Sequence, residues 1–489
     1  MKKILLLLTL FFYACKVDEP VLNISESGYP SSVGNIILRK CASSGCHNAI
    51  TQSGGLNLET WSAMFEGTNN GAVVIPYWHN QSSLFTFCNT VASLGVQNKP
   101  TMPPNADPLS LDELTLLRDW INTGALSSKK SSFVESIIKS PKYYVANQGC
   151  DLVMEVDAKK FVQTRMVRVG SSALTESPHQ VHVSSDGLYF YVVLLNGTSI
   201  EKYSTATMQK IGEIALNNGN GSGSGNWNTF VFSNDQSHAF VVDWSPQGVI
   251  NYIDLKAMKV LRVYAYDWLK YPHGIAVHPN GNYLYVLSQS GNALYKIDVS
   301  DALFPSLVAT LSLDGNPISY DASSAAALNP HDIRFDPSGN YYYVSCQKSN
   351  EVRIYNSASD AQVKTVSVGS YPQEIFFSKK WQRAFVSCTD DTVSLANRRG
   401  SVAIIDVNTQ QLISKLYVGH QPHGMAVNDA SDELIVANRN QTNDGPAPHH
   451  SSDCGGRNGN LISLDERTLE LKKKKIELSV DPYYLDLKY

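Results

Sequence analysis

Two cysteines and a histidine lie close together near the N-terminal end of the chain, in the segment Cys41-Ala-Ser-Ser-Gly-Cys46-His47. Two thiols followed directly by an imidazole are typical of covalent haem attachment, in which the cysteines form thioethers and the histidine binds the iron. A thioether follows at Met102, in Thr101-Met102-Pro103-Pro104, and methionine is a common second axial ligand. The pattern predicts a haem c with Cys41 and Cys46 on the porphyrin and with His47 and Met102 on the iron.

The spacing of the two cysteines is longer than in the usual attachment motif, which places two residues between them. Here the four residues Ala42 to Gly45 intervene, and they are small enough to fold as a loop while Cys46 and His47 keep their relation. The same residues also fit two other structures, a Cys41–Cys46 disulfide and a pair of zinc ligands. Either of these would leave the N-terminal domain without haem.

Two helices are expected to hold these loops. Residues Ser31–Lys40 carry apolar side chains at helical spacing, so a short helix would deliver the attachment loop to a core. Ser110-Leu-Asp-Glu113 is a capping-box sequence, followed by apolar residues at helical spacing and by Gly124 as a stop. The Met102 loop is therefore expected just before a terminal helix.

The stretch from about residue 31 to residue 125 resembles the planctomycete-type cytochrome c domain. This resemblance implies that Cys41 and Cys46 hold the porphyrin, that His47 is the proximal ligand and that Met102 is the distal one. His79 is then a reserve sixth ligand or a solvated loop histidine. The matching residues are Cys41, Cys46-His47, Gly54-Gly55-Leu56-Asn57-Leu58, Val74-Ile75-Pro76, Ser82-Ser83-Leu84, Met102-Pro103-Pro104 and Asp119-Trp120-Ile121-Asn122-Thr123-Gly124-Ala125.

The first residues have the pattern of an export signal: two lysines, then the apolar run Ile4–Ala14, then Cys15. The run is too short to cross a bilayer, so it predicts a signal sequence over residues 1–15 and not an anchor helix. Ala14-Cys15 resembles the cleavage point of a bacterial lipoprotein, which would make Cys15 the lipidated N-terminus and residues 16–30 a tether. We therefore expect an exported protein, periplasmic or on the cell surface, that is held to a membrane by lipid.

The composition is that of an ordinary globular protein with room for more than one core: 489 residues, 43% hydrophobic, with a formal net charge of -4. Nothing in it indicates a nucleic-acid surface. The one basic run, Lys472–Lys475, is expected on an edge strand, where lysines prevent aggregation. Because no catalytic triad, phosphate-binding loop or paired-carboxylate motif stands out, the sequence favours an electron-transfer protein over a self-contained enzyme. Oxidoreductase activity stays open.

The sequence repeats itself beyond a linker at residues 127–142, with a period of about 42–60 residues that is typical of propellers and solenoids. The openings Pro272-His-Gly-Ile-Ala-Val-His-Pro-Asn-Gly and Pro330-His-Asp-Ile-Arg-Phe-Asp-Pro-Ser-Gly show the match between units. Seven units open in this way, and the last supplies only one strand from Pro482. That strand is expected to complete the first unit and so to close the ring.

Short phrases in the repeats, among them Tyr144-Val145-Ala146-Asn147 and Ile435-Val436-Ala437-Asn438, resemble the YVTN family of bacterial β-propellers over about residues 141–489. The resemblance implies a fold and not a function, because propellers host binding, scaffolding and catalysis. Together these features predict a multidomain protein, with a small all-α cytochrome c-like domain at residues 31–126 and an all-β seven-bladed propeller at residues 143–489.

The residue after each blade-opening position is polar in every unit, and in four units it is histidine. Equivalent residues of a repeat lie at equivalent points, so these side chains are expected to meet at the mouth of the central channel. Convergent histidines suit copper or another transition metal. Alternatively, each histidine bonds a backbone carbonyl of the neighbouring blade. In chain order the residues are His179, Asn228, His273, His331, Gln373, His423 and Tyr483.

The last full blade is interrupted by an insertion at residues 441–459, which includes His449 and His450. The insertion is expected to overhang the channel face, where the two histidines would either complete a metal site or belong to a flexible polar loop. Cys346 and Cys388 occupy matching places in adjacent blades. They are expected near that face or as buried structural cysteines.

Three functions are compatible with these patterns. The first is an exported, lipid-anchored c-type cytochrome that exchanges electrons with a redox partner protein or a small oxidisable or reducible molecule, with the propeller as binding platform or second redox site. The second is a cell-surface propeller that serves as a binding module, with a haem-free structural N-terminal domain. The third is a metalloenzyme whose channel histidines carry out redox or hydrolytic chemistry. Haem absorbance separates the first function from the second.

Overall fold

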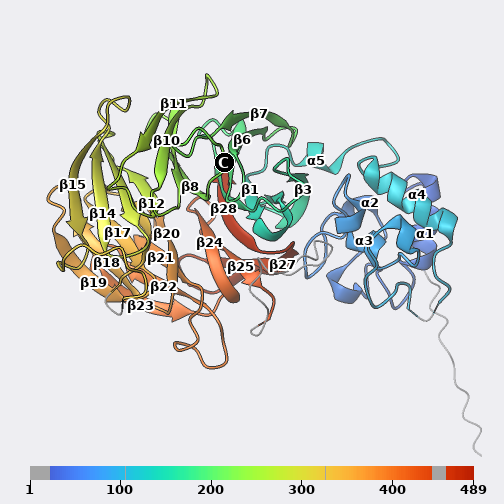
Figure 1. The fold of residues 1–489 in the computed structure, drawn as a ribbon. Helices are drawn as coiled ribbons and strands as arrows, with labels where there is room; N and C mark the ends of the chain where they lie inside the picture. Colours follow the sequence, from blue (N-terminus) through green and yellow to red (C-terminus); the bar gives the residue numbers. More distant parts are fainter. Residues whose placement is uncertain (1–22, 105, 325–326, 443–458) are drawn as a thin grey trace, which may run out of the picture.

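The computed structural model describes residues 23–104, 106–324, 327–442 and 459–489, and it consists of a helical module beside a ring of seven sheets (Figure 1). None of the helices in these residues is long and apolar enough to cross a membrane. The helices are α1 (Ser31–Lys40), α2 (Trp61–Met64), α3 (Ser83–Thr86), α4 (Leu111–Asn122) and α5 (Phe133–Ser136), with 3-10 turns at Ser53–Gly55, His79–Gln81, Ala92–Leu94 and Gln148–Cys150.

The two longest helices of the module form where the sequence predicts them. α1 buries Val33 and Ile37 on its apolar face. At the start of α4, the Ser110 hydroxyl accepts a hydrogen bond from the Glu113 N–H at 3.2 Å, and the Glu113 carboxylate accepts one from the Ser110 N–H at 2.8 Å. These two bonds complete the predicted capping box. Gly124, with a φ of 100°, ends the helix in a conformation that glycine adopts without strain.

Within the described residues the ring contains seven four-stranded antiparallel sheets, which confirms the predicted seven-bladed propeller. The first blade consists of β28 (Pro482–Lys488), β1 (Lys142–Asn147), β2 (Leu152–Asp157) and β3 (Val162–Arg168). The next three blades consist of β4 (Pro178–Val183), β5 (Tyr189–Leu194), β6 (Ser199–Ser204) and β7 (Lys210–Ala215); β8 (Trp227–Phe232), β9 (His238–Asp243), β10 (Val249–Asp254) and β11 (Lys259–Ala265); and β12 (Pro272–Val277), β13 (Tyr283–Ser288), β14 (Ala293–Asp298) and β15 (Ser306–Ser312). The last three consist of β16 (Pro330–Phe335), β17 (Tyr341–Cys346), β18 (Glu351–Asn356) and β19 (Gln362–Ser367); β20 (Pro372–Ser378), β21 (Arg383–Cys388), β22 (Ser401–Asp406) and β23 (Gln411–Leu416); and β24 (His420–Asn428), β25 (Glu433–Asn440), β26 (Gly459–Asp465) and β27 (Leu471–Leu478).

The C-terminal strand closes the ring, as the sequence predicts. β28 pairs antiparallel with β1, with Tyr143 opposite Leu487 and Val145 opposite Leu485. The first blade is therefore built from both ends of the propeller sequence, which leaves no open edge between its first and last units. The lysine run Lys472–Lys475 lies in β27, the outermost strand of the last blade, and so confirms the expected edge position.

The first strands of neighbouring blades contact one another around the centre of the ring. In β20 the pairing register on β21 shifts between Pro372 and Ile375, and the same shift occurs in β12, β16 and β24. Such a bulge adds a residue on one strand and changes the direction of the side chains beside it. As a result, two successive residues after the opening proline, such as Gln373 and Glu374, are both buried.

The helical module packs directly on the first and last blades (Figure 1). The Glu477 N–H of β27 donates a hydrogen bond to the Asn70 carbonyl at 2.9 Å. Residues 127–142, predicted as a linker, include α5, and the buried ring of Phe133 stacks on Phe65 with 4.2 Å between centroids. One hydrophobic core therefore continues from the module into the propeller.

Candidate functional site

A cavity of about 550 Å³ in the helical module is lined by all four predicted haem residues, Cys41, Cys46, His47 and Met102. A cavity of this size lies within the usual range for cofactor sites. Residues that are distant in the sequence thus meet at one place. The apolar part of the lining is formed by Leu56, Leu58, Val73, Leu84, Phe87, Pro103 and Pro104.

The loop between the two cysteines is closed by backbone hydrogen bonds. The Cys41 N–H donates to the Ile37 carbonyl of α1 at 2.9 Å, and the His47 N–H donates back to the Cys41 carbonyl at 3.1 Å. Inside the loop, the Cys46 N–H donates to the Ser43 carbonyl at 3.1 Å. The longer spacer therefore folds into a compact turn, and Cys41, Cys46 and His47 all stay at the cavity wall.

The ring of His47 is held by one specific contact. Its Nδ1 lies 2.9 Å from the carbonyl oxygen of Ser53. Because a carbonyl only accepts hydrogen bonds, Nδ1 carries the proton in this contact and Nε2 keeps its lone pair. Histidine ligands of metals are oriented by the same kind of bond, which fixes the tautomer and makes the free nitrogen more basic. His47 is therefore prepared to bind an ion through Nε2.

The Met102 loop is tied to the segment that follows α3, since the Met102 N–H donates to the Phe87 carbonyl at 2.8 Å. His79, in contrast, does not line the cavity. Its Nδ1 lies 2.8 Å from the side-chain oxygen of Asn122, at the partly exposed end of α4. The structure therefore does not support His79 as a reserve ligand, and the alternative of a loop histidine fits its position.

Cys88 is a cavity residue for which the sequence gives no role. It is buried, and its thiol shares a hydrogen bond with Cys41. This bond and burial together raise the pKa of the Cys41 thiol well above its usual value, whereas the same bond lowers the pKa of Cys88. Cys41 thus has a thiol neighbour other than Cys46, and all three cysteines are free in this structure.

The attachment loop does not bring three metal-ligand atoms together in this structure. Among the described residues, one group of three or more His, Cys, Asp or Glu side chains has all its ligand atoms within 4.8 Å of one another, and that group lies in the propeller. The ligand atoms of Cys41, Cys46 and His47 do not all lie within this distance of one another. Four ligands around one zinc ion need a closer arrangement.

The predicted channel residues do converge at the centre of the propeller. The four histidines and Tyr483 are all buried, so they lie within the channel and not at an open mouth. Successive ring centroids form a closed circuit: His179 to His273 6.2 Å, His273 to His331 4.2 Å, His331 to His423 5.8 Å, His423 to Tyr483 3.7 Å and Tyr483 to His179 4.5 Å. Side chains from five blades therefore form one cluster.

All four histidines approach the backbone of the neighbouring blade, as the packing alternative predicts: His179 approaches Asn228 and His331 approaches Gln373. The other two contacts have the geometry of full hydrogen bonds. Nδ1 of His273 lies 3.1 Å from the His331 carbonyl, and Nδ1 of His423 lies 3.1 Å from the Tyr483 carbonyl. Packing does not account for every ring nitrogen, however. Nδ1 of His179, Nδ1 of His331 and Nε2 of His423 are buried without a hydrogen-bond partner. An unpartnered buried polar atom costs about 1–3 kcal/mol, so these atoms need an explanation.

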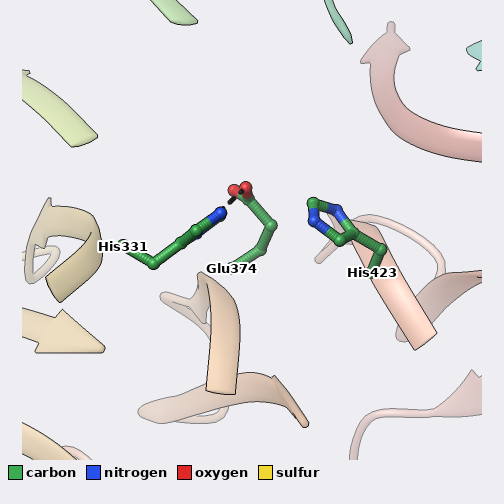
Figure 2. Close-up of side chains that lie close together, drawn as sticks. All are labelled: His331, Glu374 and His423. Atoms are coloured by element: carbon green, nitrogen blue, oxygen red, sulfur yellow. Dashed lines mark ion pairs between the residues drawn. The ribbon is translucent and has the colours of Figure 1, made fainter. Parts of the chain in front are cut away.

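The compact group in the channel consists of His331, Glu374 and His423 (Figure 2). Glu374 is a residue that the sequence analysis misses, because it follows Gln373, the expected ring position, by one residue. The sequence feature that could have indicated Glu374 is the second position after each blade opening. Only two of the seven residues at this position are acidic. These residues are Gln180, Thr229, Gly274, Asp332, Glu374, Gly424 and Tyr484.

A network of charges surrounds Glu374. One carboxylate oxygen lies 3.3 Å from the Arg334 guanidinium, which also bonds Asp332 at 3.0 Å. The other oxygen lies 3.9 Å from Nδ1 of His331, too far for a hydrogen bond. Burial, together with the charge of Asp332, raises the pKa of Glu374 to about 8, although Arg334 opposes the rise. Burial also lowers the pKa of all four channel histidines, that of His273 to about 4.

Some predicted residues contribute to neither site. Cys346 and Cys388 are buried, and burial raises the pKa of both thiols, that of Cys388 to about 12. They are structural cysteines, in agreement with one of the two expectations. Cys15, His449 and His450 lie outside the described residues.

Two parts of the chain match known families. Residues 44–106 match the planctomycete cytochrome C family, a range that includes Cys46, His47 and Met102. Residues 273–438 match the choice-of-anchor I domain family. Among curated proteins, none matches this chain.

Solved structures show the propeller fold at low sequence identity. A functionally unknown protein from Desulfotomaculum acetoxidans aligns with a TM-score of 0.52 and 14% identity, over 71% of this chain and 99% of its own. A periplasmic gluconolactonase from Pseudomonas aeruginosa aligns with a TM-score of 0.52 and 14% identity, over 72% of this chain and 99% of its own. At this identity the likeness concerns the fold alone. The chain thus joins a module that matches the planctomycete cytochrome C family to a seven-bladed β-propeller.

Proposed function

We propose that the protein is an exported, lipid-anchored c-type cytochrome that transfers electrons through a haem attached to Cys41 and Cys46. His47 and Met102 serve as the axial ligands. The observation that carries this proposal is the single cavity lined by two thiols, an imidazole with a free Nε2 and a thioether. When bound, the haem supplies an iron that accepts and gives up one electron.

The residues of the cavity have separate tasks in this function. The Ser53 carbonyl orients His47, so the imidazole would be held in place to bind the haem iron. Met102 as an iron ligand beside His47 would raise the reduction potential, because a soft thioether favours the reduced ion. The apolar lining, which includes Leu56 and Phe87, keeps water away from the site and favours the less charged state.

Two features of the chain support export: a disulfide and the pattern of a signal sequence. Cys150 takes part in a disulfide, a bond typical of oxidising compartments, and the residues before Cys15 have the pattern of a signal sequence. The fold is shared with a gluconolactonase described as periplasmic. Lipidation at Cys15 rests on the sequence pattern, and two or more acyl chains would hold the protein durably at a membrane.

The propeller acts as the platform on which a redox partner protein, or a small oxidisable or reducible molecule, reaches the module. Glu477 of β27 lines the cavity together with Thr68 and Asn70 of the module. The hydrogen bond between Glu477 and Asn70 holds the two surfaces together. A partner that approaches this side of the cavity therefore meets both domains at once.

A haemochrome spectrum of the protein expressed with a cytochrome maturation system tests the proposal. We expect a thioether-linked haem that stays with the denatured chain, and its loss in Cys46→Ala. Cys88→Ser is the matched control, because it removes a cavity thiol without removing an attachment point. A colourless protein in which Cys41 forms a disulfide with Cys46 or Cys88 would contradict the proposal and favour a propeller binding module with a haem-free N-terminal domain.

A further inference from the structure

We propose that the channel of the propeller binds one divalent first-row transition-metal ion between the imidazoles of His331 and His423 and the carboxylate of Glu374. This site is separate from the haem cavity and goes beyond electron transfer by the module. Figure 2 shows the carboxylate between the two rings, each on its own strand. The three residues come from β16, β20 and β24, the first strands of three successive blades.

The distances suit a site that closes around an ion. The three ligand atoms lie within 4.8 Å of one another. Two ligand atoms that are each about 2.1 Å from one tetrahedral ion are about 3.4 Å apart, so the widest pair has to approach by up to about 1.4 Å. Side-chain rotation supplies such a movement without a change in the strands.

The hydrogen-bond pattern leaves lone pairs for an ion. The Tyr483 carbonyl accepts the Nδ1–H of His423, which leaves Nε2 deprotonated, buried and without a partner. Nδ1 of His331 is likewise buried without a partner and faces Glu374 at 3.9 Å. A metal ion would satisfy both nitrogens, which have no full hydrogen bond in this packing, and Glu374 would supply a carboxylate oxygen as the third ligand.

The charges around the site also favour a cation. Glu374 and Asp332 bring two carboxylates, and Arg334 between them brings one positive charge. The nearby Arg439 is paired with the Asp481 carboxylate at 2.6 Å. The surroundings therefore hold one net negative charge when Glu374 is ionised, and a buried charge of this kind is stabilised by an ion that it coordinates.

Two glycines let the first strands approach closely enough to assemble this group. A side chain on Gly274 would place its Cβ 2.4 Å from the His331 carbonyl oxygen. A side chain on Gly424 would place its Cβ 2.6 Å from the Tyr483 carbonyl oxygen. Both distances are shorter than any normal contact, so glycine at these positions permits the packing that brings the ligands together.

A cavity lies beside two of the three proposed ligands, His331 and Glu374. A second cavity, of about 250 Å³, is lined by His273, His331, Asp332, Arg334 and Glu374. Three protein ligands with an open position facing a cavity are typical of reactive metal centres. Imidazole and carboxylate without thiolate suit Zn²⁺, Cu²⁺, Fe²⁺ and Ni²⁺.

Zinc binding to the full-length, haem-loaded protein tests the proposal. After removal of metal with a chelator, we expect the protein to take up one Zn²⁺ per chain in equilibrium dialysis, counted separately from haem iron. X-ray absorption at the zinc edge should show nitrogen and oxygen at about 2.0–2.1 Å and no sulfur at about 2.3 Å. Sulfur scatterers, or a wild-type protein that binds no zinc at micromolar concentration, would overturn the proposal.

Three variants connect the zinc to this site. His423→Gln and Glu374→Gln should each weaken zinc binding by at least about tenfold. Glutamine is tolerable at the first of these positions because Gln373 occupies the equivalent place in the preceding blade. His179→Asn, which copies the equivalent Asn228, is the matched control and should bind zinc as the wild type does, since His179 lies outside the group.

Folding is checked in the same samples. Circular dichroism should show the wild-type β-sheet content in all three variants. Zinc should raise the midpoint of thermal unfolding of the wild type and of His179→Asn but not of His423→Gln, because only a bound ion stabilises the native state. Equal zinc affinity in the wild type and in a folded His423→Gln variant would overturn the assignment.

Discussion

The haem cavity and the channel cluster are both built around histidine, but the chain assembles them in opposite ways. His47 follows Cys46 directly, and the carbonyl of nearby Ser53 orients its ring. His331 and His423 come from different blades and meet only when the ring has closed. A site contained in one short segment can be recognised from spacing, whereas a site built from repeats depends on the register of every strand that surrounds it.

The surroundings of the two sites differ as well. The haem cavity is wide and mostly apolar, which suits a large planar cofactor. The channel cluster is narrow and polar, and its side chains are almost fully buried, which suits a single ion. The helical module nevertheless shares one continuous hydrophobic core with the first and last blades of the propeller, so the stabilities of module and propeller are expected to be coupled.

The largest expected effect concerns this coupling. Phe133 is buried at the junction and stacks on Phe65, so Phe133→Ala should lower the free energy of unfolding by about 3–5 kcal/mol. Urea unfolding followed by haem absorbance and by far-ultraviolet circular dichroism measures the module and the propeller separately. We expect the two transitions to coincide in the wild type and the module to unfold first in the variant.

A matched control is Leu174→Ala in the propeller. Leu174 is 79% exposed, so its truncation should change the free energy of unfolding by less than about 0.5 kcal/mol. If Phe133→Ala were as mild as this control, the junction would not couple the two regions, and each site would have to be stable within its own domain.

The next effect concerns the haem cavity alone. In Met102→His a nitrogen ligand replaces the thioether, which should lower the reduction potential by on the order of 0.1 V, equivalent to about 2.3 kcal/mol per electron. Spectroelectrochemical titration measures the shift. His79→Ala is the control, because His79 bonds Asn122 outside the cavity and should leave the potential unchanged. A wild-type potential in Met102→His would exclude Met102 as a ligand.

The parts of this structure that follow from local or repeated patterns could be predicted from the sequence. The capping box at Ser110 and the stop at Gly124 are set by bonds within one turn of chain, and both are found. The closing strand β28 follows from the incomplete last repeat. The convergence of His179, His273, His331 and His423 follows from their equivalent places in the repeat.

The residues that the sequence misses depend on contacts between distant segments. Cys88 belongs to no sequence motif, and its place in the cavity is apparent only because the fold brings it against Cys41. Glu374 is buried beside the channel histidines because a bulge follows Pro372. In a regular strand, successive side chains point to opposite faces, so Glu374 would point away from the face that Gln373 occupies. His79 belongs to a matching segment but is held elsewhere by Asn122. Spacing alone reports none of these contacts.

The smallest expected effect concerns the response of the propeller channel to acid. Burial, with the charges of His273 and Arg439, lowers the pKa of His179 well below its usual value of about 6.5. Below pH 6.5 the unfolded chain therefore binds a proton at this residue that the native channel does not bind. Stability is present above pH 6.5 and is lost as the pH falls, with a slope of at most about 1.4 kcal/mol per pH unit for this one proton.

Exchange of histidine and asparagine between equivalent blades measures this slope. His179→Asn removes the titrating group, so the free energy of unfolding, measured with urea at pH 7, 6 and 5, should fall less steeply than in the wild type. Asn228→His places a histidine at a position that is 1% exposed and should make the fall steeper. The slopes of the unfolding free energy against pH are compared, and not the free energies themselves, because repacking around a substituted side chain changes the free energy by the same amount at every pH. Equal slopes in all three proteins would contradict this prediction. They would mean that water reaches the channel and that these histidines titrate as exposed residues do.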